Sequence, residues 1–231
     1  TATGLENSSR LLVVDIPVAL SFQINEALSV GATVDAVWSG MNLNLLLGAN
    51  QVGGLIADGR VNGSLLGALA TLPALDGAHL SFTRDHPLSS GADAWGVSGR
   101  LGLNWSLSED TRFGAAYNFG THLNDLQGGA VLTAVDQVAG QIPISGRVHV
   151  RDFQMPASLG AGVTHQLQDN WSLSLDVTRV FWRDVLKDLH VSFTSDSGDD
   201  LNLTVPQNYK DQTILAVGTD YAIYDWILRA G

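Results

Sequence analysis

The chain has 231 residues, no cysteine and a formal net charge of −11. The lack of cysteine excludes a disulfide scaffold, a thiolate metal centre and a cysteine nucleophile. The excess of acidic side chains argues against a nucleic-acid partner, because phosphates bind to basic surfaces. Apolar residues make up 45% of the sequence, yet they never form the run of about 18 that a membrane-spanning helix needs.

Strict alternation of apolar and polar residues is the strongest pattern in the chain. From residue 12 to residue 24 every even position is apolar, whereas the odd positions include Asp15, Ser21 and Gln23. A period of two predicts a β-strand with one apolar face. The same pattern predicts strands over 28–38, 95–107, 113–119, 157–163, 171–177 and 215–221, and the start of another over 226–231. We therefore expect seven strands and the beginning of an eighth.

The second face of these strands decides between two classes of β protein. It consists of Gly, Ser, Asn, Thr and isolated charges, and the whole chain contains only two lysines. The outer face of a soluble sandwich would be richer in long charged side chains. In an outer-membrane barrel, the apolar face meets lipid and small polar residues line the interior. The pattern favours an all-β, transmembrane, antiparallel up-and-down barrel; a soluble β protein is the alternative.

The lengths of the links between strands also alternate. Short polar links occur at 25–26, 108–110, 168–170 and 224–225, whereas long links lie near 46–92, 127–145 and 194–210. Short turns at one rim and long loops at the other are typical of outer-membrane barrels. Six aromatic residues lie close to the short turns, namely Phe22, Trp105, Phe113, Trp171, Tyr224 and Trp226. They predict an aromatic girdle at one membrane interface, or else ordinary packing at strand ends.

The longest link is unusually apolar. The loop 46–75 contains eleven large aliphatic residues but only two charged ones, namely Asp58 and Arg60. The spacing of Leu65, Leu66, Leu69 and Leu72 predicts a short amphipathic helix. An apolar loop of this kind indicates a ligand-binding surface. Alternatively, the helix packs against the rim or plugs the lumen.

Several sequence blocks resemble the FadL/TodX family of outer-membrane transporters for long-chain fatty acids and other hydrophobic compounds. The blocks are 28–32 (LSVGA) with 35–38 (DAVW), 94–105 (AWGVSGRLGLNW) with 109–112 (EDTR), 155–156 (MP), 170–171 (NW) with a second tryptophan at 182, 194–198 (TSDSG), 209–211 (YKD) and 224–226 (YDW). Each block alone is weak. Their order and spacing match the middle strands of the family over nearly the whole chain.

The resemblance implies a monomeric barrel of fourteen strands in the outer membrane of a Gram-negative bacterium, surrounded by outer-membrane lipid and lipopolysaccharide. A hydrophobic ligand would be captured in a groove between extracellular loops and would then diffuse through a barrel plugged by an N-terminal hatch, without a cofactor. The expected ligand-binding residues are Leu45, Leu46, Leu47, Leu55, Ile56, Leu65, Leu66, Leu69 and Lys210. Lys210 matches a lysine near the internal pocket of fatty-acid transporters, or it is a solvated loop lysine.

The chain also departs from the family pattern. Leu45 occupies the position where fatty-acid transporters place a basic residue, so a neutral hydrocarbon or aromatic becomes a competing substrate. The Asn-Pro-Ala signature of the hatch is missing, and only about half of the fourteen strands are present. We therefore expect residues 1–231 to be an internal part of a longer barrel.

The sequence argues against an enzyme and a metal site. The six histidines lack metal-ligand spacing, and no Gly-x-Ser-x-Gly nucleophile elbow occurs. An outer-membrane hydrolase is thus the weakest alternative. A general diffusion porin would need opposed rows of charge at its constriction. The charges expected in the lumen are too few and too separated for such rows: Asp35, Arg100, Arg112, Asp176 and Asp220.

Overall fold

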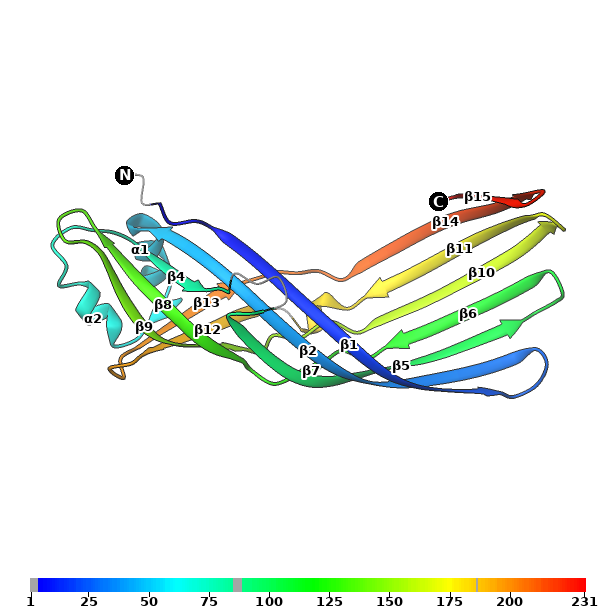
Figure 1. The fold of residues 1–231 in the computed structure, drawn as a ribbon, viewed down its shortest axis with the longest axis horizontal. Helices are drawn as coiled ribbons and strands as arrows, with labels where there is room; N and C mark the ends of the chain where they lie inside the picture. The colour runs from blue at the N-terminus through cyan, green and yellow to red at the C-terminus, as the bar shows by residue number, and fades with distance from the viewer. Residues whose placement is uncertain (1–3, 85–88, 186) are drawn as a thin grey trace.

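The computed structural model describes residues 4–84, 89–185 and 187–231, which form one antiparallel sheet of fifteen strands. Figure 1 shows a long, bent sheet that carries the short turns at one end and two helices at the other. No helix in these ranges is long and apolar enough to cross a membrane.

Eight of these strands form a continuous curved wall, in the spatial order β15-β14-β11-β10-β6-β5-β2-β1. They are β1 (Ser8–Gln23), β2 (Leu28–Gly48), β5 (Ala92–Ser106), β6 (Thr111–Asn118), β10 (Ser158–Gln168), β11 (Trp171–Val180), β14 (Gln212–Ile223) and β15 (Trp226–Ala230). All eight strand segments predicted from the alternation are confirmed. Among the described residues, the edge strands β1 and β15 do not pair with each other, so the wall is open.

Short turns connect the wall strands at one end, as the sequence predicts. In the β1–β2 turn, Asn25 accepts hydrogen bonds through Oδ1 from the backbone N–H groups of Ala27 (2.9 Å) and Leu28 (2.8 Å). A short side chain that bonds its own backbone in this way stabilises a tight turn. Tyr224 adopts a left-handed backbone conformation (φ 51°) in the β14–β15 turn.

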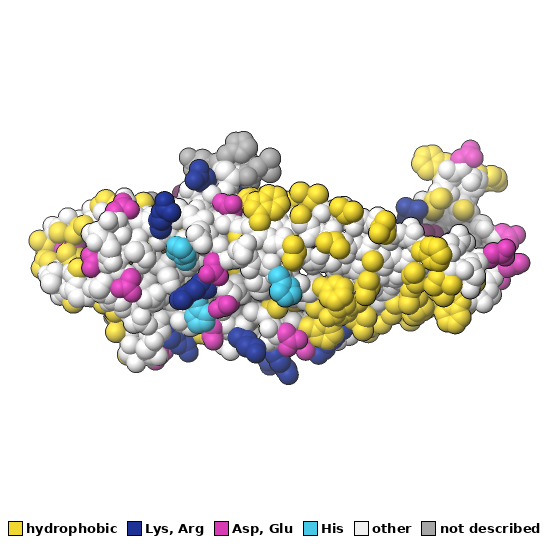
Figure 2. Space-filling view, turned by 90° about the horizontal axis from the view of Figure 1, so that it is seen from below, with side chains coloured by type: hydrophobic (Ala, Val, Ile, Leu, Met, Phe, Trp, Pro, Cys, Tyr) yellow, Lys and Arg dark blue, Asp and Glu magenta, His cyan; other side chains and the backbone are white. Residues whose placement is uncertain are grey.

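The apolar face of the wall is its outer face. Leu28, Trp105 and Phe113 lie directly opposite one another across β2, β5 and β6, so their side chains share one face. Large residues on this face are exposed, for example Leu20 at 79% and Leu215 at 73% of their accessible surface. Figure 2 shows hydrophobic side chains gathered over this half of the molecule. Such an extensive exposed apolar band fits contact with lipid.

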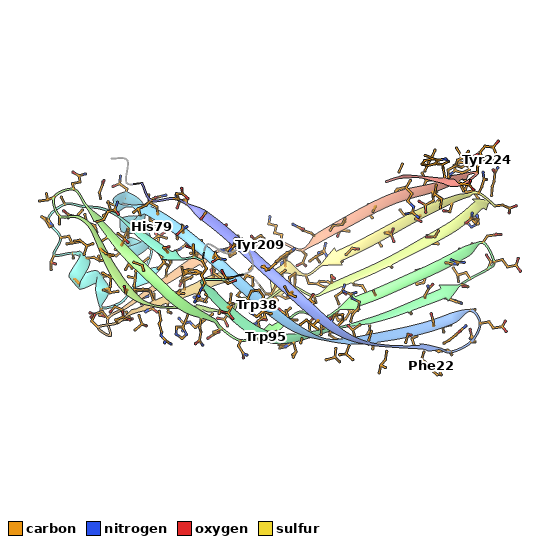
Figure 3. The ribbon with its side chains drawn as sticks, viewed as in Figure 1. Phe22, Trp38, His79, Trp95, Tyr209 and Tyr224 are labelled. Carbon is orange, nitrogen blue, oxygen red and sulfur yellow. The ribbon has the colours of Figure 1, made fainter. Side chains whose placement is uncertain are left out.

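Aromatic residues border this band at both ends. Phe22 and Tyr224 lie at the short-turn end, whereas Trp38 and Trp95 lie midway along the molecule (Figure 3). Trp38 and Trp95 face each other across β2 and β5, and the indole N–H of Trp38 donates to Asp93 Oδ2 (3.2 Å). Trp95 and Trp105 are ten positions apart on β5, which corresponds to about 33 Å along the strand and about 25 Å along the membrane normal at a typical tilt. That height equals the apolar band of an outer-membrane barrel.

The long links contain more strand than the sequence predicts. They include β3 (Val61–Asn62), β4 (Leu75–Phe82), β7 (His122–Leu123), β8 (Leu126–Asp136), β9 (Gly140–Arg151), β12 (Asp188–Ser195) and β13 (Asp200–Pro206). The expected loop 127–145 is thus mostly a hairpin of β8 and β9, and the expected loop 194–210 contains all of β13. Gly140, Pro143 and Gly146 interrupt the alternation and resemble turn signals, which explains the error.

Except for β7, which pairs with β5, these additional strands continue the sheet beyond the tryptophans, in the order β2-β4-β8-β9-β12-β13-β3. Together with helices α1 (Ala49–Ala57) and α2 (Leu65–Leu69) they form a unit that we call the cap. The main cluster of buried side chains lies largely in the cap, around Phe82, Leu126, Val148, Val150 and Phe193. A short 3₁₀ helix, η1 (Trp182–Asp184), lies between β11 and β12.

Candidate functional site: an apolar cavity in the cap

The inner face of β2 changes character along the strand. In the wall, its inward side chains include Thr33, Asp35 and Ser39, each of which has a buried oxygen without a hydrogen-bond partner among the described residues. Beyond Trp38 the strand enters the cap, where the inward positions Leu45 and Leu47 line an apolar cavity. One strand therefore presents a polar surface to the lumen of the wall and an apolar surface to the cap.

The cavity is enclosed by strands from both sides of the cap and by both helices. Its volume is about 50 Å³. Among the described residues, its lining is entirely apolar and consists of Leu45, Leu47, Val52, Leu55, Val61, Leu66, Ala78, Leu80, Leu132, Val191, Phe193, Leu201 and Leu203. A cavity without polar groups offers no hydrogen bond to water and is suited to an apolar ligand.

Helix α1 covers the cavity but is intrinsically weak. It has nine residues and includes Gly53 and Gly54, each of which lowers helix stability by about 1 kcal/mol relative to alanine. Its N-terminus is held by Gln51, whose Oε1 accepts from the Gly48 N–H (3.0 Å). The helix ends before Gly59, which has a positive φ of 69°.

Hydrogen bonds between Ser64 and Asp200, which we call the latch, join the helical segment to β13 on the far side of the cavity. Ser64 Oγ donates to Asp200 Oδ1 (3.0 Å) and accepts from the Asp200 N–H (2.9 Å), while the Ser64 N–H also donates to Asp200 Oδ1 (3.1 Å). These hydrogen bonds, led by the one from the Ser64 backbone, hold the pKa of Asp200 below its ordinary value of 3.8. Val61 and Asn62 of β3 pair with Leu203 and Asn202 of β13 beside the latch.

The structure brings together four of the nine expected ligand residues at the cavity, namely Leu45, Leu47, Leu55 and Leu66. Leu65 and Leu69 of α2 are buried, but neither lines the cavity. The remaining residues lie elsewhere. Leu46 is on the opposite face of β2 from its neighbours, and Ile56 is 42% exposed. Because the strand β2 continues to Gly48, the apolar loop itself is shorter than the expected 46–75.

Lys210 lies apart from the cavity. It is exposed in the link between β13 and β14. Its neighbour Tyr209 stacks on Trp182 with ring centroids 5.3 Å apart, and Asp211 forms an ion pair of 3.2 Å with Arg179. Within the described part of the chain, the cavity lining contains no cationic side chain.

Nine of the lining residues were missed by sequence reasoning. Most of them belong to β4, β8, β12 and β13. The sequence predicts long links over nearly all of β4, β8 and β13, and it assigns no strand to β12. A usable signal exists in 189–193 and 201–205, where Leu189, Val191 and Phe193 alternate with polar residues, as do Leu201, Leu203 and Val205. These runs are short, and they lie far from the helical link in the sequence. The sequence pattern therefore does not indicate that they meet that link in one cavity.

The inner face of the wall contains a wider hollow of about 690 Å³. Glycines and small polar residues of β2, β5, β6, β10 and β11 form much of its surface, together with Arg112 and Asp176. In the lumen, Asp220 pairs with Arg229 at 3.5 Å rather than with a charge on an opposite wall. The described residues contain no group of three or more acidic or histidine side chains that could hold a metal ion.

Comparison with known proteins identifies relatives of this fold. Residues 2–231 match a family model described as outer membrane protein transport protein (OMPP1/FadL/TodX). A search of curated proteins found no match.

Solved structures match over most of this chain. The CymD monoaromatic hydrocarbon channel is 46% identical over 97% of this chain and 59% of its own, with a TM-score of 0.91. The Pseudomonas putida toluene transporter TodX is 39% identical, with coverages of 99% and 55% and a TM-score of 0.91. For the Ralstonia pickettii toluene transporter TbuX the identity is 45%, the coverages are 94% and 53%, and the TM-score is 0.83.

A Pseudomonas aeruginosa FadL homologue is only 19% identical, with a TM-score of 0.62, and shares the fold. The chain spans between 53% and 59% of the length of CymD, TodX and TbuX. The open wall is accordingly part of a larger barrel, and the resemblance recognised in the sequence is confirmed. The chain belongs to the OMPP1/FadL/TodX family of outer-membrane β-barrel transport proteins of Gram-negative bacteria.

Proposed function

We propose that this chain forms the capture region and part of the barrel wall of a passive channel for small, neutral hydrophobic molecules, with monoaromatic hydrocarbons as the substrate class. The observation that carries the proposal is the cavity beneath α1 and α2, whose described lining is entirely apolar. The high identity to the monoaromatic hydrocarbon channel CymD supports the same substrate class. As in the sequence-based expectation, the barrel acts as a monomer.

A neutral ligand fits this cavity better than a fatty acid. Transfer of a carboxylate into an apolar site is costly unless a cation accompanies it. Leu45 stands at the position where a basic residue was expected for a fatty acid, and it lines the cavity. Lys210, the other candidate cation, is exposed in the β13–β14 link.

Capture requires the cap to open. The cavity of about 50 Å³ is smaller than the roughly 150 Å³ cavity that accommodates benzene in an engineered protein core. Helix α1, weakened by two glycines, is the part of the enclosure that moves at the lowest cost. The ligand then passes toward the wider hollow of the wall and travels down its concentration gradient.

Two neighbouring residues of α1 provide a matched test. Leu55 lines the cavity, whereas Ile56 is exposed on the same helix. In the full-length protein, Leu55→Trp would fill the cavity without introducing charge. Ile56→Trp would add the same side chain on the exposed side of the helix and would leave the cavity unfilled. Uptake of radiolabelled toluene at low concentration, measured in cells that lack other hydrocarbon channels, should fall several-fold for Leu55→Trp and stay unchanged for Ile56→Trp.

Equal toluene uptake in both variants, with both proteins folded by heat-modifiable gel migration, would refute the role of the cavity. Palmitate uptake by the unmodified protein gives a second comparison. If palmitate enters at least as efficiently as toluene, the assignment to neutral hydrocarbons is wrong even if the cavity is the capture site.

A further inference from the structure

A row of basic side chains lies on the outer face of the cap. Along β9, Val148 and Val150 are completely buried. Arg147 and Arg151, which flank them, are exposed, and His149 between them is half-buried. Because side chains alternate along a strand, Arg147, His149 and Arg151 all point away from the core. Successive members of the row are about 7 Å apart along the strand.

The strand register places this row just beyond the lipid-facing band. Asp93 of β5 pairs with Gln127 of β8, which in turn pairs with His149. Trp95, at the border of the band, lies two residues from Asp93 toward the short turns. The row therefore begins near the level of the Trp38 and Trp95 side chains and extends from there into the cap, away from the short turns. This is the level at which the phosphates of the outer leaflet meet the protein surface.

The basic row has no acidic partner of its own. Among the described residues, Arg147, His149 and Arg151 form no ion pair, although the chain carries 23 acidic side chains. Two acids in the same registers accept from neutral donors: Asp93 accepts from Trp38, and Asp200 accepts from Ser64 and Asn202. The two guanidinium groups thus remain available to an external anion.

Neighbouring residues position the arginines and leave space around them. Arg151 donates from its guanidinium to Ser192 Oγ on β12 (3.0 Å). Ser192 pairs with His149, so this hydrogen bond directs the guanidinium toward His149. Gly129 lies opposite Arg147, and a Cβ atom there would have no heavy atom within 4 Å. Figure 2 shows basic and histidine side chains, interspersed with acidic ones, near the border between the hydrophobic band and the cap.

We propose that Arg147, His149 and Arg151 bind the phosphate groups of lipopolysaccharide in the outer leaflet. Guanidinium groups bind phosphate oxygens through paired, charge-assisted hydrogen bonds. The position of the row at the edge of the lipid-facing band allows the acyl chains of the same lipid to pack on the exposed apolar residues of β5. This contact anchors the cap relative to the membrane and is separate from ligand transport.

The test uses the full-length protein in neutral detergent and two double variants. Arg147→Gln/Arg151→Gln removes the row, and Arg112→Gln/Arg229→Gln removes two arginines near the short-turn end. The probe is lipid A carrying both phosphates, with dephosphorylated lipid A for comparison, and its affinity is measured by surface plasmon resonance. We expect the first variant to lose about thirtyfold in affinity, the factor that two basic residues near an anionic lipid surface contribute, and the second to retain its affinity.

An equal affinity of the unmodified protein and the first variant would overturn the proposal, as would an equal loss in both variants. Equal binding of dephosphorylated lipid A would also overturn it, because acyl-chain contact alone would then explain the affinity. Displacement of lipid A by millimolar inorganic phosphate alone would identify a general anion site and would contradict a lipid-specific one. Circular dichroism of each variant verifies that the barrel is folded.

Discussion

At the scale of single residues, the environment of a side chain in this protein depends on which face of its strand or helix it occupies. Leu45 and Leu46 are adjacent, yet only Leu45 lines the cavity. Leu55 and Ile56 differ in the same way on α1. Lys210 is on neither a strand nor a helix: it is exposed in a link and does not enter the apolar lining.

The position of Lys210 leads to a prediction about substrate charge. Lys210→Ala should leave toluene uptake unchanged within about twofold, because exposed substitutions of this kind change free energies by about 0.5 kcal/mol or less. It should also leave fatty-acid binding unchanged, measured with a spin-labelled fatty acid against an alkane of equal length. A selective loss of fatty-acid affinity would instead assign the lysine to carboxylate binding.

The Ser64–Asp200 latch leads to a prediction about pH. The pKa of Asp200 is lowered in the folded protein, so its contribution to stability is complete above the ordinary value of 3.8 and is lost as pH falls through the lower folded-state pKa. We expect limited proteolysis of the 49–75 segment to accelerate in this acidic range. Ser64→Ala should make that segment more sensitive at neutral pH and remove most of the acid-dependent increase. An unchanged pH profile in Ser64→Ala would show that other acids control the opening.

At the scale of elements, the junction between wall and cap depends on close backbone contact. Beyond Ala92, β5 gives way to β4 as the neighbour of β2, and β8 pairs with β5 at Ala92 and Asp93. Gly128 makes this crossing possible, because a Cβ atom there would lie 1.7 Å from the carbonyl oxygen of Gly91. The adjacent Gly129 faces open space.

The two glycines form a matched pair for a stability experiment. Gly128→Ala should destabilise the junction by about 3 kcal/mol or more, since the clash involves backbone rather than a movable side chain. Gly129→Ala should have little effect. Hydrogen exchange in β8 and β9 of the full-length protein would measure the difference. Similar protection in the two variants would mean that the junction adapts to the added methyl group.

At the scale of the whole molecule, the wall has two unpaired edges. Within the described residues, β1 pairs only with β2 and β15 only with β14, so each edge presents unpaired backbone N–H and C=O groups. Such groups are costly in lipid, and a transmembrane sheet is stable only when it closes. Closure therefore requires strands in addition to these, and this chain covers only 59% of the length of CymD and 55% of that of TodX.

Residues 1–231 expressed alone should therefore not form a stable pore. Refolding into detergent should give no heat-modifiable band on a gel, whereas the full-length protein should give one. Reconstituted in liposomes, the full-length protein should not admit neutral sugars in order of their size. Strong size-graded swelling would favour a general diffusion porin instead, and a folded band from the isolated span would show that it closes on itself.

The strands of the wall are predictable from the sequence because each obeys a local rule. Lipid on one side and a polar lumen on the other impose an alternation on every strand, whatever its neighbours, and Asn25 marks its turn by bonding its own backbone. The cap obeys no such uniform rule. Its strands face a protein core on one side and water on the other, and Gly140, Pro143 and Gly146 interrupt the pattern in β9.

The sequence by itself determined the wall, its orientation toward lipid and the family, since these follow from short-range alternation and from the order of sequence blocks. Only the tertiary structure decided the cavity. Its residues meet because β3 pairs with β13 across a separation of 140 positions, between Asn62 and Asn202. The free energy of such long-range pairing depends on the whole cap packing together, and this cooperative contribution leaves no periodic signal in either segment alone.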